Sequence, residues 1–344
     1  MTFTGYPQST GERISGCANS LQNRISMRDR GREAQTPPNS VPNRQHLGMP
    51  KAPGTRVEVT RPDKLLWPGA GITKQAYVDY LAAVAEHQLP WLRDRPLSVI
   101  RAPDGVDGER YFQKNTPKYA PPWIKTVTIP APSAGRDVAY TVCNDADTLA
   151  WLGNQAALEL HPAPVRRDLL DKPDLFVVDI DPPDDAFEAA VEVAFLVLET
   201  MDDLGLDPLV KTTGGKGIHV VVPIVRHVSA EQLRRAATRL AEIVIERRPD
   251  LVTAEFRKAD RKGRVMLDPS RNGPGATLVA PFSPRARAEA TVSFPVRPAE
   301  LKKVAPGDFT IASARKRLAS AAVKAWTEAA AAKGQRLPAS LLKA

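Results

Sequence analysis

The chain has 344 residues, of which 42% are hydrophobic and 25% charged, and its formal net charge is +9. This length can bury a sizeable core, and the composition is that of an ordinary globular protein. Two cysteines, Cys17 and Cys143, exclude a disulfide framework or a cysteine-based zinc site, and no apolar run predicts a membrane span or a signal peptide. We therefore expect a cytoplasmic protein with no membrane partner, and the basic charge makes a polyanion such as nucleic acid the first partner to consider.

Residues 1–50 differ in composition from the rest of the chain. They are rich in Ser, Pro, Asn, Gln, Gly and Arg and poor in large apolar side chains. Such a segment buries too little apolar surface to offset the entropy lost on ordering. We therefore predict a disordered basic tail over residues 1–50 and one folded domain over residues 51–344.

Ordered structure is expected from about Val57. Thr73 is a typical helix N-cap residue, and the apolar stripe that follows it predicts a helix as far as Leu92. The next segments are expected to be three short strands and one buried helix, over Leu97–Arg101, Arg110–Gln113, Thr126–Ile129 and Thr148–Leu160.

The second half of the chain alternates strands and helices. A continuous apolar strand is expected over Asp174–Asp181 and a helix over Ala186–Leu204. Ser229 and Gln232 fit a capping box that opens a helix to about Arg247. The remaining segments are a short run over Leu209–Lys211, a strand over Gly217–Ile224, a strand pair over Arg264–Asp268 and Ala276–Ala280, and closing helices from about Ser313.

Asp179 and Asp181 end the apolar strand, two residues apart. Side chains alternate along a strand, so both carboxylates face the same side of the sheet, about 6–7 Å apart. Carboxylates at this spacing can share Mg²⁺ or Mn²⁺ ions that lie roughly 3.5–4 Å apart, a geometry suited to phosphoryl or nucleotidyl transfer. The alternative is a solvated strand end before a proline turn.

The segment Thr212–His219 combines three glycines, one lysine and a histidine. Glycines let backbone amides approach phosphate oxygens, and Lys216 adds a point charge. The spacing is not that of a Walker A loop. His219 could donate a hydrogen bond to a phosphate; the alternative is a tight turn followed by an ordinary strand histidine.

A second apolar strand ends in acid at Asp268, and Arg271 follows three residues later. Asp268 could complete a carboxylate triad with Asp179 and Asp181, and Arg271 could reach a bound triphosphate. A basic run precedes Asp268 and consists of Lys258, Arg261, Lys262 and Arg264, for which the alternative is a solvated hairpin. Together, two acidic strand ends, a Gly-Lys turn and nearby arginines predict a metal–triphosphate site.

In this order, Asp-x-Asp, Gly-Gly-Lys-Gly-x-His and Leu-Asp-x-Ser-Arg-Asn resemble the archaeo-eukaryotic primase superfamily, and more closely the polymerase domain of bacterial ligase D, the end-joining DNA ligase. The resemblance is colinear over about residues 57–320 and includes Asp63–Pro68, Tyr111–Lys114, Ala120–Trp123, Gln155–His161 and Ala280–Ser283. It implies an α/β (α+β) fold with an N-terminal DNA-gripping module over residues 51–165, an RRM-like antiparallel catalytic sheet over 166–310 and C-terminal helices over 311–344.

The resemblance also implies roles for matching positions. Two divalent metal ions, Mn²⁺ or Mg²⁺, would be bound by Asp179, Asp181 and Asp268. An incoming NTP or dNTP would be contacted by Thr213, Lys216, His219, Arg271 and Arg285. Lys64 and Lys74 would hold the 5′-phosphate at the far side of a DNA gap. Phe112 would stack on the template, and Lys114 would lie on the DNA backbone.

The implied reaction is template-directed attack of a primer 3′-hydroxyl on the nucleotide α-phosphate, in end joining or in excision repair. Implied partners are gapped or broken DNA, a Ku-type end-binding protein and a separate DNA ligase, and we expect a monomer associated with the bacterial nucleoid. The sequence departs from the family pattern in having Thr213 where serine is common and Ala276 where a lysine often lies nearby. No Lys-x-Asp-Gly ligase sequence occurs, which predicts a stand-alone member.

Two other functions stay open. A metal-dependent glycosyltransferase also uses Asp-x-Asp, but it leaves the spacing of Asp268 and Arg271 and the basic excess unexplained. A non-catalytic protein that bridges DNA ends would need no metal site, so the three acids argue against it.

Overall fold

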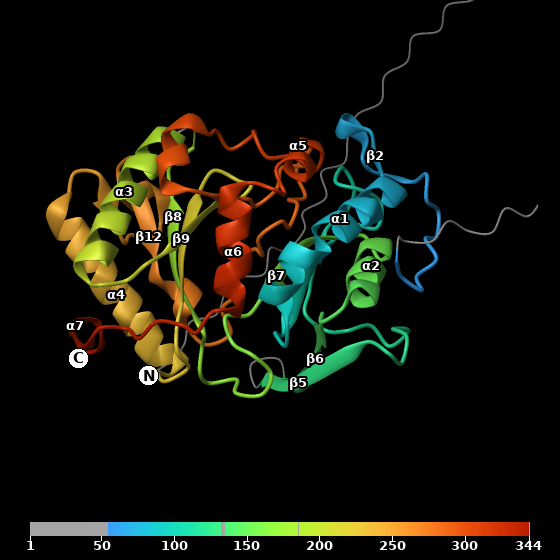
Figure 1. Cartoon of the computed structure of the whole chain (residues 1–344), viewed down its shortest axis with the longest axis horizontal. Helices are drawn as coiled ribbons and strands as arrows, with labels where there is room; N and C mark the ends of the chain where they lie inside the picture. The colour runs from blue at the N-terminus through green and yellow to red at the C-terminus, as the bar shows by residue number, and fades with distance from the viewer. Residues whose placement is uncertain (1–53, 132–134, 185, 344) are drawn as a thin grey trace, which may run out of the picture. The chain divides into compact units, whose positions relative to one another are not determined.

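The computed structural model describes residues 54–131, 135–184 and 186–343, which belong to one compact unit (Figure 1). The tail predicted over residues 1–50 lies outside the described residues. Within the described residues, no helix combines the length and apolar character needed to cross a bilayer.

The first part of the described chain is an α/β module. Its elements are β1 (Leu65–Trp67), η1 (Pro68–Ala70), β2 (Ile72–Thr73), α1 (Lys74–Leu92), β3 (Leu97–Arg101), β4 (Tyr111–Gln113), β5 (Lys125–Ala131), β6 (Arg136–Val142), α2 (Ala146–Asn154) and β7 (Ala157–Pro162). The sheet runs in the order β4-β3-β6-β5, and β7 also pairs with β3. As predicted, Thr73 caps α1 by accepting a hydrogen bond from the amide of Ala76. The strand β6 was not predicted.

The helix predicted over Thr148–Leu160 is wrong after Asn154. There α2 ends, Ala156 takes a left-handed φ of 54°, and the chain continues into β7, which pairs antiparallel with β3. An apolar run alone does not separate a buried helix from a buried strand. In β7 the buried Leu158 and Leu160 alternate with polar residues, and that two-residue period is the signal for a strand.

The second part has the strand–helix–strand–strand–helix–strand order of an RRM-like fold. Its elements are β8 (Leu175–Asp181), α3 (Phe187–Asp203), β9 (Leu209–Thr212), β10 (Ile218–Pro223), α4 (Ala230–Arg247), β11 (Val252–Thr253), η3 (Lys258–Arg261), β12 (Val265–Asp268), η4 (Pro269–Asn272) and β13 (Pro295–Val296). The sheet order is β11-β12-β8-β10-β9-β13, and its pairs are antiparallel except that between β11 and β12. The predicted α/β fold with an RRM-like antiparallel sheet is confirmed.

The segment after η4 differs from the prediction. Ala276–Ala280 forms no strand with β12, because η4 turns the chain away from the sheet. Instead, the amides of Leu278 and Ala280 donate to the carbonyls of Pro162 and Leu160 in β7, at 3.2 and 2.9 Å. The segment therefore ties the RRM-like part to the N-terminal module. After η5 (Pro298–Lys303), which was not predicted, the predicted closing helices are present as α5 (Ile311–Lys316), α6 (Ala321–Ala331) and α7 (Ala339–Leu342).

The two faces of β8 are packed differently. On one face, covered by α3 and α4 (Figure 1), three apolar side chains enter the main core: Phe176, Val178 and Ile180. On the other face, Leu175 and Val177 join a smaller apolar cluster with side chains of α1 and α6. Since side chains alternate, Asp179 and Asp181 share this second face, beyond the apolar cluster.

Candidate active site

Four ionisable residues form a cross-strand row on the sheet face opposite α3 and α4. Asp268 of β12 pairs with Asp179 of β8, and Asp179 pairs with His219 of β10. His219 pairs in turn with Lys211 of β9. Cross-strand partners share a face, and neighbouring strands lie about 4.8 Å apart, so the acidic ends of two strands meet. Asp181 stands two residues further along β8, on the same face.

Asn272 fixes the turn that follows Asp268. Its Oδ1 accepts a hydrogen bond from the amide of Val177 at 2.8 Å, and its Nδ2 donates to the carbonyl of Val177 at 2.7 Å. The side chain thus extends the ladder on β8 after the backbone of β12 has left the sheet. This turn places Nε of Arg271 3.0 Å from Oδ2 of Asp179 and 3.5 Å from Oδ2 of Asp268.

Asp179 and His219 are both buried, and their surroundings set their charges. Burial opposes ionisation of Asp179, but its contacts with His219 and Arg271 outweigh burial and hold the pKa of this carboxyl well below its ordinary value. Burial, together with the charge of Lys211, lowers the pKa of His219 to about 4, so the ring is neutral at pH 7. His219 Nε2 lies 3.3 Å from Oδ1 of Asp179. The neutral ring therefore supports Asp179 as a hydrogen-bond donor, and Arg271 supplies the compensating charge.

Asp181 contacts two cations that come from turns. Nη1 of Arg261 lies 2.9 Å from its Oδ2, and Nζ of Lys216 lies 3.5 Å from its Oδ1. Arg261 also donates to the carbonyls of Glu255 and Phe256, at 3.0 Å each, so its guanidinium is held in place. From the sequence, Arg261 was only one member of a basic run.

Thr213 organises the glycine turn. Its hydroxyl oxygen accepts from the amides of Gly215 and Gly217, both at 3.2 Å, and donates to the carbonyl of Gly217 at 3.1 Å. Gly214 has a φ of 67°, and a Cβ there would lie 2.7 Å from neighbouring backbone, so the turn requires glycine. Two of the amides expected to face a phosphate, those of Gly215 and Gly217, are therefore directed at Thr213 instead, while Lys216 lines the site cavity.

A buried glutamate links the N-terminal module to this turn. Glu159 of β7 lies 2.9 Å from Nε of Arg285 and 2.9 Å from Nε2 of His161. Burial opposes ionisation of Glu159, but its contacts with His161 and Arg285 lower its pKa to about 2. Nη1 of Arg285 donates to the carbonyl of Thr213 at 2.9 Å. Sequence analysis gave Glu159 and His161 no role, although their segment matched the family.

Most of these side chains line one cavity of about 380 Å³. It contains all eight residues predicted to bind metal or nucleotide: Asp179, Asp181, Asp268, Thr213, Lys216, His219, Arg271 and Arg285. Its other side chains were not predicted for the site and include His161, Phe256, Arg261, Met266, Thr277 and Arg287.

Lys64 and Lys74 lie together outside this cavity. Lys74 is buried, with its Nζ 3.3 Å from Oγ1 of Thr60. Burial and the charges of Lys64 and Arg61 lower the pKa of Lys74, which reflects the proximity of three cationic side chains. Nζ of Lys64 lies 2.7 Å from Oδ1 of Asp104.

Phe112 lies in the edge strand β4, and Lys114 is the residue that follows this strand. Phe112 is 54% exposed, and Nζ of Lys114 lies 5.9 Å from the centre of its ring. The ring of His161, which lines the cavity, is 6.1 Å from the Phe112 ring. An exposed aromatic surface therefore adjoins the cavity on the side of the N-terminal module.

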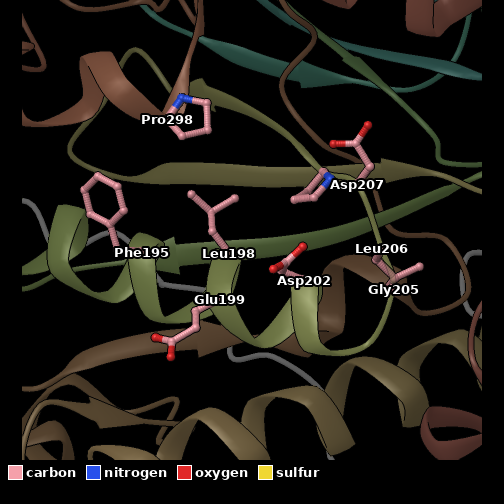
Figure 2. Close-up of a pocket in the computed structure, with 9 residues that line it drawn as sticks. Phe195, Leu198, Glu199, Asp202, Gly205, Leu206, Asp207 and Pro298 are labelled. Atoms are coloured by element: carbon pink, nitrogen blue, oxygen red, sulfur yellow. The ribbon is translucent and has the colours of Figure 1, made fainter.

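A separate pocket lies at the C-terminal end of α3. It is bounded by Phe195, Leu198 and Asp202 of α3, the turn Gly205–Pro208, and Pro298 (Figure 2). Because α3 covers the face of β8 opposite the acids, this pocket is remote from the catalytic row and contains none of the predicted site residues.

A family model described as the LigD primase-polymerase domain matches residues 73–326. The chain belongs to the LigD primase-polymerase family. The multifunctional non-homologous end joining DNA repair protein LigD of Mycobacterium tuberculosis is 35% identical over 270 residues, which cover 74% of this chain and 34% of that protein. The bifunctional non-homologous end joining protein LigD of Bacillus subtilis is 32% identical over 259 residues, covering 74% of this chain and 41% of that protein. The chain thus spans about a third to two fifths of the length of these relatives.

The solved polymerase domain from Mycobacterium tuberculosis Ligase D, in complex with DNA, superposes with a TM-score of 0.73 at 32% identity. The match covers 79% of this chain and 98% of that one. LigD primase-polymerase domains are nucleotidyltransferases, so the resemblance found in the sequence is confirmed and the chain is an enzyme of this type. Membership in this family excludes the glycosyltransferase and the non-catalytic binder.

LigD primase-polymerase domains depend on a metal ion, and the donor set of this cavity fits one. Asp179, Asp181 and Asp268 offer the hard oxygen ligands that Mg²⁺ and Mn²⁺ prefer. Among the described residues, however, no three potential ligands are arranged closely enough to hold an ion. The carboxylates instead contact Arg261, Arg271 and Lys216, which would compete with an ion for their oxygens.

Proposed function

We propose that this chain is a template-directed polymerase that adds NTPs or dNTPs to a DNA 3′-end and fills short gaps whose far side carries a 5′-phosphate. The observation that carries the proposal is the convergence of three carboxylates with Lys216 and Arg271 in one cavity. The acids suit the divalent counterions of a triphosphate and the cations suit its phosphate oxygens, so the two groups together would bind it better than either group alone.

We further propose that the carboxylates bind two divalent ions, Mn²⁺ or Mg²⁺. Bound there, the ions would neutralise the triphosphate and assist ionisation of the attacking hydroxyl. Arg271 and Lys216, which contact the carboxylates in the structure, are placed to transfer to the phosphates of the incoming nucleotide. No side-chain nucleophile is needed for this reaction, since the 3′-hydroxyl itself attacks the α-phosphate, the bond between the α- and β-phosphates breaks and pyrophosphate leaves.

The remaining predicted nucleotide contacts are Thr213, His219 and Arg285. Arg285 is held by Glu159 and by the carbonyl of Thr213, so its guanidinium keeps a fixed direction at the cavity wall. A fixed cation loses less side-chain entropy on binding a phosphate than a mobile one does. His219 contributes chiefly through Asp179, against which its Nε2 lies.

The DNA is proposed to lie along the N-terminal module. Lys64, Lys74 and Arg61 form a compact cationic group of the kind that binds a terminal phosphate. Phe112 offers an exposed ring for stacking on a template base, and Lys114 beside it suits the backbone. The solved relative in complex with DNA supports a DNA substrate for this chain as well.

The pathway is proposed from the relatives, which are named for non-homologous end joining. A Ku-type protein and a separate ligase are the partners this pathway would need, and gap filling in excision repair is the second candidate. We also propose a monomer associated with the nucleoid, with residues 51–165 gripping DNA, 166–310 carrying catalysis and 311–344 packing as closing helices.

A substrate panel with Mn²⁺ tests the proposal. Labelled NTPs and dNTPs would be offered on gapped duplexes with and without a 5′-phosphate, and on bare single strands. We expect templated incorporation that is strongest on the phosphorylated gap and is abolished in Asp179→Ala. Asp203→Ala is the matched control, because this exposed acid of α3 pairs with Arg247 and neither residue lines the cavity. Incorporation that ignores the template base, or survives in Asp179→Ala, would overturn the proposal.

A further inference from the structure

Lys211 is a fully buried lysine at the end of the catalytic row. Its exposed fraction is 0%, and its Nζ donates to Oγ of Ser293 at 2.7 Å. The Ser293 hydroxyl itself donates to the carbonyl of Thr212 at 2.9 Å. A lysine amino group has further N–H donors, and burying them without acceptors is costly. An apolar side chain would avoid this cost, so we expect the buried amino group to have a role that offsets it.

His219, in contrast, has a buried hydrogen-bond acceptor without a donor in the described part of the chain. A carboxylate only accepts hydrogen bonds, so the ring nitrogen that faces Asp179, Nε2, carries the proton of the neutral ring. Nδ1 is then an acceptor. It is buried, and among the described residues it has no hydrogen-bond partner.

Lys211 and His219 are direct cross-strand partners of β9 and β10, so their side chains lie on the same sheet face. A buried donor in need of an acceptor thus adjoins a buried acceptor in need of a donor.

We propose that Lys211 is a positioning residue for nucleotidyl transfer, whose amino group donates to Nδ1 of His219 through one bridging water. This contact keeps the Nε2 proton directed at Asp179, and so orients the carboxylate from two strands away. Its catalytic consequence rests on the proposed function, but the protonation of the ring is a property of the protein without nucleotide.

Nitrogen NMR of the full chain with ¹⁵N-labelled histidine tests the contact. The sequence contains five histidines, and His219→Asn identifies the signals of this ring. We expect wild-type His219 to be protonated at Nε2 alone. In Lys211→Met, which keeps the side-chain length but has no donor, the Nδ1 signal should shift and the Nε2-protonated form should lose its dominance. Lys324→Met, at an exposed position of α6, should leave both signals unchanged.

Kinetics on a gapped template then test the consequence. We expect Lys211→Met to lower kcat by about tenfold, the usual loss when a residue behind a catalytic ligand is removed, and to leave the Kd for DNA unchanged. If Lys211→Met fails to fold, Ser293→Ala provides the test, because it frees the lysine from its anchor. Wild-type protonation at Nδ1, or unchanged His219 signals in both variants, would overturn the inference. A wild-type protein without polymerase activity would overturn the proposed function and leave the NMR result standing.

Discussion

Arg261 and Asp181 form an ion pair of 2.9 Å across 80 residues of sequence. The side chain of Arg261 is 7% exposed and that of Asp181 is 30% exposed, so water screens the pair only in part. A carboxylate held by a guanidinium is less available to a divalent cation. The turn that carries Arg261 therefore competes with the metal proposed for the cavity.

Replacing Arg261 by alanine should strengthen metal binding, because Asp181 no longer has to leave a cation. If the competing ion pair contributes about 1 kcal/mol, its loss corresponds to about fivefold tighter binding of Mn²⁺. Isothermal titration of the nucleotide-free protein measures this affinity. Arg239→Ala is the matched control, since this exposed arginine of α4 pairs with Glu242 and neither residue lines the cavity. Equal or weaker Mn²⁺ binding by Arg261→Ala would contradict the competition.

The central acids were predictable from local sequence. Asp179 and Asp181 end an apolar run, and the two-residue period of a strand puts them on one face. Asp268 ends a second such run, and the antiparallel pairing of β12 with β8 brings it opposite Asp179. These residues could be found because strand period and apolar patterning are properties of short segments.

The surrounding contacts were not predictable in this way. Glu159 was placed in a helix, and its contacts with Arg285 and the amide of Ala286 span more than 120 residues of chain. Arg261 reaches Asp181 only because η3 turns it back toward the sheet. Such partners depend on the packing of distant segments, which a local pattern does not encode.

Asn272→Ala should destabilise the protein and weaken catalysis together. Asn272 is fully buried, and its loss leaves the amide and carbonyl of Val177 without these partners. An unsatisfied buried donor and acceptor together cost about 2–4 kcal/mol, which thermal unfolding would show as a Tm lower by several degrees. Asn154→Ala, which breaks exposed bonds to Thr60 and Glu58, should have a much smaller effect. Equal Tm changes in the two variants would rule out this role for Asn272.

Asp174 should contribute to the acid stability of the protein. Burial opposes its ionisation, but Arg95 and Arg166, at 2.5 and 2.6 Å, outweigh burial and lower its pKa. An unfolded aspartate titrates near 4, so as the pH falls through this value and on toward the folded pKa, the unfolded state binds more protons and stability is lost.

Asp174→Asn should therefore cost on the order of 3–5 kcal/mol at pH 7, because Arg95 stays buried without its carboxylate. The difference from wild type should shrink as the pH falls toward 3. Urea unfolding across this range measures both quantities. Asp171→Asn is the control, since this exposed acid lies 4.0 Å from Lys172. If the difference in unfolding free energy between wild type and Asp174→Asn stayed constant with pH, Asp174 would not be a source of acid stability.

Lys64 and Asp104 should set the preference for a 5′-phosphate in opposite directions. Asp104, with 79% of its side chain exposed, contacts Nζ of Lys64 at 2.7 Å and would compete with a phosphate for it. Lys64→Ala should weaken binding of a phosphorylated gap and reduce the slope of log K against log salt by about 1, as expected for one lost phosphate contact. Asp104→Ala should tighten binding instead, because the lysine is released. Fluorescence anisotropy with gaps that carry or lack the phosphate measures both changes, and Lys303→Ala, on η5, should alter neither. If Lys64→Ala weakened binding of the phosphorylated and the unphosphorylated gap equally, the lysine would be a general contact to the DNA backbone, and the 5′-phosphate would bind elsewhere.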